Sequence, residues 1–267
     1  MTQEATACYK TRHTHIPASP FTSFPTHNFS SCQLQQISCS EIMAKDMTLL
    51  WGSGSPPCWR IMMTLEEKNL QGYNQKMLSF EKMEHKSQEV MAINPRGQLP
   101  AFKHGDKILN ESYAACLYLE SQYKGQGAKL IPDCPSAQAM MYQRMFECMA
   151  LGEKMANVIY YNYKVPEGER HDSAIQRNRE ALSAELKLWE GYLQKLGSCC
   201  YLAGKDFSLA DVIVFPAIAY VFRFGLCQEH YPKLAAYYNC VKERASVKAT
   251  WPPTWKDSPG QDLLRDL

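Results

Sequence analysis

The tetrapeptide Ser55-Pro56-Pro57-Cys58 follows a short apolar run at 48–51 and precedes a stretch with helical spacing. We predict a strand before it and a helix after it. The first turn of a helix carries unpaired N–H groups and the positive end of the helix dipole, so it stabilises an anion such as a thiolate. Ser55 cannot form a disulfide, but its hydroxyl can donate a hydrogen bond to a bound sulfur anion. In the alternative interpretation, Ser55 only caps the helix.

A second motif, Asn94-Pro95-Arg96-Gly97-Gln98-Leu99-Pro100, comes directly before a predicted strand at 101–103. A proline that opens a strand indicates a turn or a cis peptide bond. A cis Leu99–Pro100 bond would turn the backbone N–H and C=O of Leu99 away from the sheet. They could then pair with the backbone of a peptide ligand. The alternative is a simple loop rich in glycine and proline.

The third motif is Glu111-Ser112, at the start of a predicted helix over 112–123. Ser112 can cap this helix, and the neighbouring free N–H groups suit a carboxylate. Glu111 would suit an ammonium group in the same space. The pair therefore fits the end of an amino acid, which carries both charges. The alternative is an ordinary capped helix.

The elements that position these motifs fall into two groups. The first is a strand at 48–51, a helix at 58–68, a weaker strand at 73–80, a hairpin of 101–103 and 107–109, and the helix at 112–123. This order within about 80 residues is typical of a thioredoxin-like fold. After a linker, the helical pattern continues from Pro135 to about Tyr163, over 175–196, from Ser208 and from about Pro232. We predict a thioredoxin-like domain over 44–127 and an all-helical domain over 135–258.

The composition excludes several classes of function. The 267 residues include 29 basic and 27 acidic ones, a net charge of +2, which gives no electrostatic case for binding nucleic acid or a membrane surface. No apolar run reaches the roughly 20 residues that span a bilayer. The longest, 212–222, contains a proline and is predicted to be a buried core helix. The 11 cysteines follow neither a zinc pattern nor a regular disulfide framework, which favours reduced thiols in the cytoplasm and no metal site.

Residues 1–43 are rich in Ser, Thr, Pro and His and show no period, so we expect a disordered extension. They lack the continuous apolar segment of a secretory signal. A translation start upstream of Met43, a transit peptide and a gene-model artefact are three competing explanations. Against a transit peptide, the basic residues of this segment are only Lys10 and Arg12.

Glutathione meets the requirements of all three motifs, because it has a thiol, a peptide backbone and a γ-glutamyl end with both charges. The motifs, in this order and spacing, resemble the glutathione site of cytosolic glutathione transferases that have a catalytic serine. The resemblance extends over about residues 47–255, and the sequence is most similar to the rho class, near theta, delta and zeta. Phe207-Ser208-Leu209-Ala210-Asp211 is similar to the capping box of the family's central C-terminal helix.

The resemblance implies an enzyme that conjugates reduced glutathione, as a co-substrate, to electrophilic hydrophobic compounds in detoxification. It further implies a cytoplasmic homodimer in which Ser55 is catalytic. The implied glutathione-binding residues are His85, Gln98, Leu99, Pro100, Glu111 and Ser112. The candidates for the electrophile pocket in the helical domain are Met149, Met155, Tyr160, Tyr161, Phe222 and Trp255.

Three other functions remain open. Trp59-Arg60 is similar to the zeta class, which includes glutathione-dependent isomerases, but that class has Ser-Ser-Cys before its Ser-Trp-Arg. A non-catalytic binding or scaffold protein can share the fold, although it has no need for Ser55 and Glu111. A thiol–disulfide or dehydroascorbate reductase would need a cysteine at position 55. Cys58 is its alternative nucleophile, and we expect Cys58 to face the core.

Overall fold

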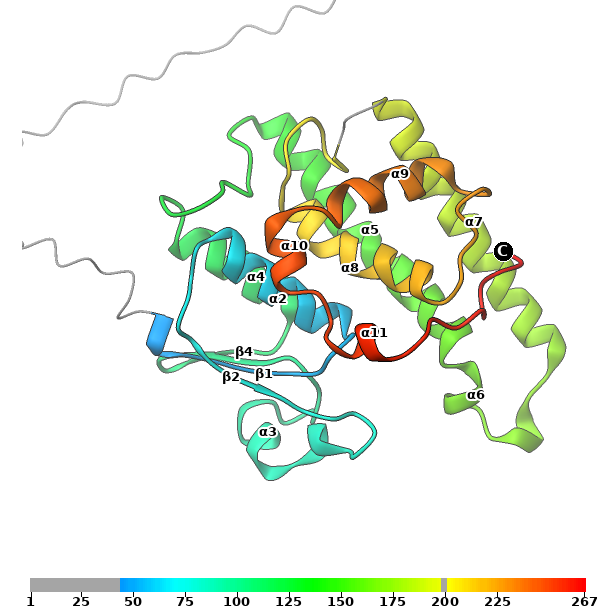
Figure 1. Ribbon diagram of the computed structural model, residues 1–267, viewed down its shortest axis with the longest axis horizontal. Coiled ribbons are helices and arrows are strands. Elements are labelled where there is room, and N and C mark those ends of the chain that lie inside the picture. The colour runs from blue at the N-terminus through cyan, green and yellow to red at the C-terminus, as the bar shows by residue number, and fades with distance from the viewer. Residues whose placement is uncertain (1–43, 198–200) are drawn as a thin grey trace, which may run out of the picture. The chain divides into compact units, whose positions relative to one another are not determined.

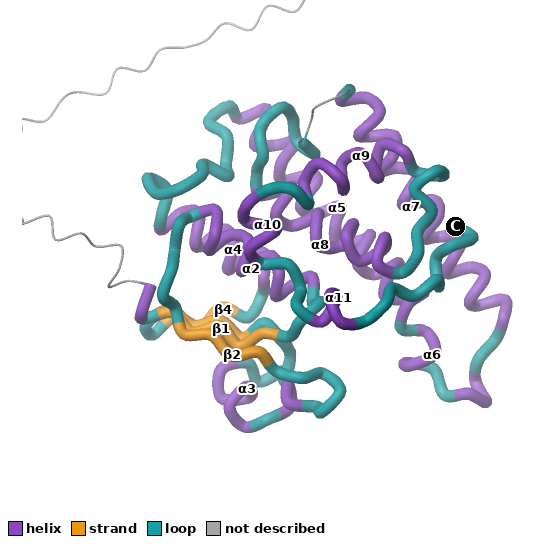
Figure 2. Tube along the Cα trace, viewed as in Figure 1, coloured by secondary structure: helices purple, strands orange, loops and turns teal. Residues whose placement is uncertain are grey.

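Four short strands form one mixed sheet in the order β2-β1-β3-β4 (Figure 2). The computed structural model describes residues 44–197 and 201–267, so the predicted extension over 1–43 lies outside the described residues. The strands are β1 (Met47–Trp51), β2 (Asn74–Met77), β3 (Ala101–His104) and β4 (Lys107–Leu109). β1 runs parallel to β2 and antiparallel to β3, and β3 pairs antiparallel with β4. β2 is shorter than the predicted strand at 73–80.

Helices cover both faces of this sheet. α2 (Pro56–Glu67) and α4 (Ser112–Gln122) pack side by side on one face, and α3 (Gln88–Ile93) lies on the other (Figure 1). The sequence pattern did not predict α3, because six residues with only Val90 buried are too short to show a helical period. The element order is therefore βαβαββα, the thioredoxin-like order with one more helix than expected.

The rest of the chain is helical, as predicted. Its helices are α5 (Pro135–Ile159), α6 (Tyr161–Lys164), α7 (Asp172–Leu196), α8 (Leu209–Arg223), α9 (Pro232–Val241), α10 (Ala245–Ala249) and α11 (Thr254–Asp257). Two 3₁₀ turns, η1 (Glu84–Lys86) and η2 (Glu167–Glu169), lie between these elements. The predicted helix from Pro135 to Tyr163 is interrupted at Tyr160, where α5 ends and α6 begins.

The central helix α8 is buried along almost its whole length, as predicted for 212–222. It begins with the expected capping box. The Ser208 side chain accepts a hydrogen bond from the backbone at the helix start, and the carboxylate of Asp211 accepts one from the N–H of Ser208. α8 packs against both α2 and α5, so it forms the layer that joins the helical part to the sheet part.

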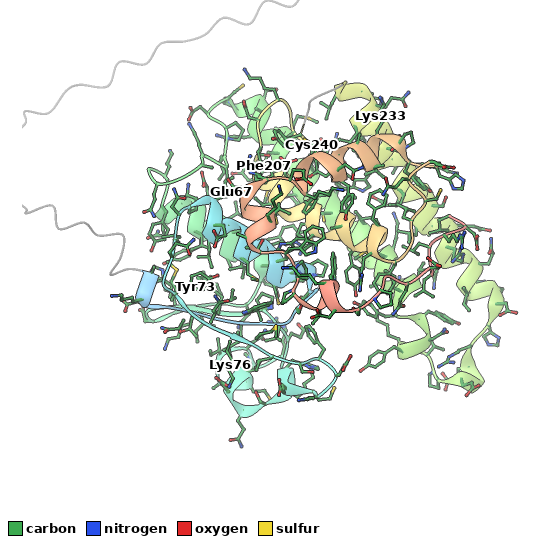
Figure 3. The ribbon with its side chains drawn as sticks, in the orientation of Figure 1. Glu67, Tyr73, Lys76, Phe207, Lys233 and Cys240 are labelled. Atoms are coloured by element: carbon green, nitrogen blue, oxygen red, sulfur yellow. The ribbon has the colours of Figure 1, made fainter. Side chains whose placement is uncertain are left out.

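A polar contact at the end of α2 also ties the two parts together. The Glu67 carboxylate accepts hydrogen bonds from the guanidinium of Arg244 and the hydroxyl of Ser246, at the start of α10. Arg244 also stacks over the ring of Phe207, 3.9 Å from its centroid. Figure 3 labels Glu67 and Phe207 on the side of the protein where this contact lies. α2 is thereby fixed between the sheet and the helical part.

None of the helices within residues 44–197 and 201–267 combines the length and the hydropathy that crossing a membrane requires.

Candidate functional site

The sheet brings the predicted motifs together at one of its ends. β1 ends beside the end of β2, where Trp51 pairs with Met77. β3 is antiparallel to β1, so its first residue, Ala101, lies opposite Leu50 near the same end. β4 is antiparallel to β3 and returns there, with Leu109 opposite Phe102. The segments that contain Ser55, His85, Leu99-Pro100 and Glu111-Ser112 consequently all begin or finish at this end.

Ser55 occupies the N-cap position of α2 and is partly exposed. Within the described residues its side chain caps no backbone N–H group. The first two helical residues are prolines, which have no N–H to donate, so Cys58 supplies the first free amide hydrogen of the helix. The contacts therefore do not support the interpretation that Ser55 is only a cap. The hydroxyl lies at the positive end of α2, where a bound thiolate would be stabilised.

Cys58 faces the core, as predicted, and its side chain is 1% exposed. The thiol accepts a hydrogen bond from the N–H of Gly52, with an N–S distance of 3.5 Å. Burial raises the pKa of the Cys58 thiol to about 11, although hydrogen bonds from Ser55 and Gly52 and the charge of Arg60 act in the opposite direction. A thiol with this pKa is protonated at neutral pH and is a poor nucleophile.

The loop before β3 contains a cis Leu99–Pro100 bond, one of the two alternatives that the sequence left open. Asn94, which is 2% exposed, shapes this loop. Its amide donates to the carbonyl oxygen of Gln98 at 2.9 Å, and its side-chain oxygen accepts from the N–H of Arg96 at 3.2 Å. Leu99 and Pro100 are buried, whereas Gln98 is exposed.

At the start of α4, Ser112 does not take the capping position that the sequence suggested. Glu111 is the N-cap residue and is exposed, and Ser112 is the first helical residue and is 6% exposed. The hydroxyl of Ser112 does not cap the helix but accepts a hydrogen bond from Nη1 of Arg60 at 3.2 Å. A hydroxyl that accepts from a guanidinium still has its own hydrogen to donate to a ligand.

His85 lies in the turn η1 and is partly buried. Its Nδ1 atom is buried and has no hydrogen-bond partner among the described residues. Burial, with a smaller contribution from the charge of Lys86, lowers the pKa of His85, which favours the neutral ring. The ring is 5.4 Å from the ring of Phe80, which covers Gly52 so closely that a Cβ there would lie 2.2 Å from it. Phe80 therefore connects His85 to the end of β1.

A cavity of about 770 Å³ opens beside the turn that contains Ser55. Its walls come from that turn, the loop after β2, the end of α8 and the segment 254–261. Several of these residues have aromatic rings: Phe80, Tyr220, Phe224 and Trp255. A second cavity, of about 260 Å³, lies behind Trp255 and is lined by Phe222, Tyr238 and Trp251. The larger cavity can hold an apolar molecule beside Ser53 and Gly54, the two residues before Ser55.

The six residues predicted for the electrophile pocket lie in different places. Trp255 lines both cavities, and Phe222 lines the smaller one. Tyr160 lines neither cavity, but its hydroxyl lies 2.6 Å from that of Tyr220, which lines the larger one. The other three line neither of these two cavities: Met149 is 61% exposed, Met155 is buried, and the hydroxyl of Tyr161 accepts from the N–H of His171.

Two contributors to the site were not predicted from the sequence. Arg60 was noted only within the Trp59-Arg60 pair, yet it is buried and contacts Ser112. Thr254 contacts Ser53, two residues before Ser55, across 201 positions of sequence. The sequence carries no signal for contacts at such separations.

Comparison with known proteins identifies the family. A family model described as the glutathione S-transferase N-terminal domain matches residues 53–127, and one for the C-terminal domain matches 140–245. Glutathione S-transferase A of Pleuronectes platessa is 73% identical over 226 residues, which cover 84% of this chain and all of that protein.

Two solved structures agree with this assignment. A glutathione S-transferase from the Antarctic clam Laternula elliptica is 37% identical with a TM-score of 0.75, covering 83% of this chain and 99% of that one. A glutathione transferase homologue from Sulfitobacter with bound glutathione is 26% identical with a TM-score of 0.67, covering 77% and 96%. This chain belongs to the glutathione S-transferase family, and its activity is the transfer of glutathione to electrophilic substrates.

Proposed function

We propose that Ser55 activates the thiol of glutathione by donating a hydrogen bond to the thiolate. The free thiol titrates near the cysteine reference, roughly 8.5, so little of it is ionised at pH 7. A shift of about two pKa units corresponds to roughly 2.7 kcal/mol in favour of the thiolate. The observation that carries this proposal is the position of Ser55 at the N-cap of α2, with a side chain that caps no N–H group among the described residues.

The remainder of glutathione would lie along the same end of the sheet. Leu99, before Pro100, would pair with the peptide backbone, and Gln98 flanks it. Glu111 would accept from the γ-glutamyl ammonium, and Ser112 would donate to its carboxylate. His85 is the candidate for the other end of the tripeptide, since the contact with Phe80 places its ring near the end of β1.

The electrophile would occupy the cavity of about 770 Å³, whose aromatic walls suit a hydrophobic compound. The thiolate would attack its electrophilic carbon, while Ser55 remains a hydrogen-bond donor and never becomes a covalent nucleophile. Proximity and the exclusion of water would supply the rest of the acceleration. A pocket with apolar walls suits the detoxification of foreign hydrophobic compounds. The attack of the thiolate needs no metal.

We further propose a cytoplasmic homodimer of the rho class. The described cysteines are all free thiols, which suits a reducing compartment. α5 presents exposed apolar side chains, Phe146 at 59% and Met149 at 61%, that a partner subunit could cover. The mass of the purified protein in solution, measured by light scattering, tests the dimer.

The decisive experiment compares Ser55→Ala with Cys58→Ala in conjugation of glutathione to a generic aromatic electrophile. Ser55→Ala should fold normally, bind glutathione within a few-fold, and lose most activity at neutral pH. Cys58→Ala should lower the melting temperature, because it removes a buried side chain, yet retain the chemistry. Full activity in Ser55→Ala together with an inactive Cys58→Ala would overturn the serine mechanism and favour the reductase.

A further inference from the structure

The turn that presents Ser55 has a conformation that needs support. The N–H of Ser55 donates to the carbonyl oxygen of Gly52 at 3.3 Å, which closes a four-residue turn. Gly54, the third residue of this turn, has a φ of +74°, the value that a type II turn requires at that position. Ser55 is the last residue of the turn, so its direction depends on how the two central residues, Ser53 and Gly54, are held.

The far end of the chain holds both central residues. The hydroxyl of Ser53 lies 2.7 Å from the hydroxyl of Thr254 and also accepts from the N–H of Thr254 at 3.2 Å. The indole of Trp255 lies over Gly54, where a Cβ would be 2.7 Å from Nε1. In Figure 1, α11, which contains Thr254 and Trp255, lies beside the junction of β1 and α2.

The segment that carries Thr254 is itself anchored to α2. The indole of Trp59 donates to the hydroxyl of Thr250 at 2.8 Å, and both groups are buried. Trp59 also packs edge-on against Trp251 and Trp255, at centroid distances of 5.3 and 5.5 Å. Edge-to-face aromatic contacts of this kind favour one relative orientation of the rings. The segment over 250–255 therefore cannot shift without moving the helix that begins at Ser55.

We propose that Thr254 is a positioning residue for the transferase reaction: through Ser53 it fixes the turn that directs the Ser55 hydroxyl at the thiolate. The inference rests on the proposed role of Ser55. Thr254 touches neither the thiol nor Ser55, so it acts on the alignment of the hydrogen bond to sulfur. Ser53, Thr254 and Trp255 also line the cavity of about 770 Å³. The contact between Ser53 and Thr254 is therefore part of the wall of the proposed electrophile site.

The test uses the full-length protein with Thr254→Val, which replaces the hydroxyl by a methyl group, and Thr254→Ser, which restores it. Thr48→Val applies the same exchange in the first half of β1, away from the turn. The readouts are the pH profile of kcat/KM, the thiolate absorbance of bound glutathione and the melting temperature. Ser53→Ala and the double variant complete a mutant cycle.

Thr254→Val should raise the apparent pKa of the bound thiol and lower kcat/KM at neutral pH about three- to tenfold, the effect of one misaligned hydrogen bond. Activity should approach that of the wild type at higher pH, and KM for glutathione should change little. Thr254→Ser and Thr48→Val should behave as the wild type. Ser53→Ala should resemble Thr254→Val, and the double variant should add little further.

The inference is overturned if Thr254→Val leaves the thiol pKa unchanged while Ser55→Ala raises it, or if Thr254→Ser is as impaired as Thr254→Val. A loss of activity in Thr254→Val that follows the melting temperature at constant thiol pKa also overturns it, since that result indicates a purely structural role. If Ser55→Ala itself leaves the pKa unchanged, the proposed role of Ser55 fails, and this inference fails with it. The comparison of the two variants therefore separates the two failures.

Discussion

Arg60 donates a hydrogen bond from Nη1 to the hydroxyl of Ser112, 3.2 Å away, and another from Nε to the carbonyl oxygen of Ile213, 2.8 Å away. Arg60 is 7% exposed, and none of the ion pairs within 44–197 and 201–267 includes it. Neutral acceptors therefore satisfy this buried guanidinium. The same side chain joins α8 to the first residue of α4, where we place the γ-glutamyl group.

Replacing Arg60 with methionine should lower the free energy of unfolding. The change removes the charged donor to the buried carbonyl of Ile213, which keeps only the weaker donor at the thiol of Cys148, and a hydrogen bond to a charged group is worth about 1.5–3 kcal/mol. Urea unfolding measures the loss, with Arg177→Met, at an exposed position of α7, as the matched control. Arg60→Lys should be intermediate, because lysine keeps the charge but cannot reach both acceptors in one plane. Equal stability of Arg60→Met and the wild type would show that these hydrogen bonds are unimportant.

Glu111→Ala should weaken the binding of glutathione without altering the chemistry at sulfur. The variant removes the charged partner of the ammonium group, and a hydrogen bond to a charged group is worth roughly 1.5–3 kcal/mol, so KM for glutathione should rise about tenfold or more. KM for the electrophile and the pKa of the bound thiol should stay near the wild-type values. Calorimetric titration with glutathione gives the affinity, and Glu180→Ala on the exposed face of α7 serves as control. Unaltered affinity in Glu111→Ala would remove the proposed γ-glutamyl site.

Asp211 should make the folded protein more stable as the pH falls from 7 to 4, the reverse of the usual effect of a carboxylate. Burial raises the pKa of Asp211 from 3.8 to about 6, although its carboxylate accepts hydrogen bonds from Leu202, Ser208 and Tyr237. Between these two pH values the folded protein holds a proton that the unfolded chain lacks. Through this group, the free energy of unfolding therefore rises as the pH falls from 7 to 4, by up to about 3 kcal/mol.

Asp211→Asn lacks the titrating group, so it isolates this effect. The variant should be less stable than the wild type at pH 7, because an amide cannot accept all of these hydrogen bonds. The difference in stability between the two proteins should grow as the pH is lowered, which urea unfolding at several pH values measures. A difference that shrinks toward pH 4 would mean that the hydrogen bonds to the ionised carboxylate outweigh its burial.

The helix starts at two of the three motifs could be predicted because each depends on local backbone chemistry. Two prolines after Ser55 start one helix and Glu111-Ser112 begins another, whereas the sequence left the cis Leu99–Pro100 bond open beside a simple loop. That the motifs meet at one end of the sheet followed from the order of the elements. The location of the cavity did not, because its wall includes segments around Ser53, Phe80, Tyr220 and Thr254 that lie far apart in the sequence.

By itself, the sequence determined the order of the strands and of the helices other than α3, and the chemistry available at position 55. Periodicity and turn residues act over a few positions, so they need no tertiary contacts. The tertiary structure alone decided which groups contact the polar side of α2. Arg60, Thr64 and Glu67, spaced four and three residues apart, look like a solvent-facing side, yet all three are buried.

The physical reason is that spacing reports the polarity of a helix face, while burial depends on which element packs against it. α8 and α10 cover this face of α2 and supply its hydrogen-bond partners: the carbonyl of Ile213 is 153 positions from Arg60, and Ser246 is 179 positions from Glu67. A buried charge is tolerated only where such partners exist. The sequence therefore determined that a helix follows Ser55, and the tertiary structure decided which distant side chains hold that helix in place.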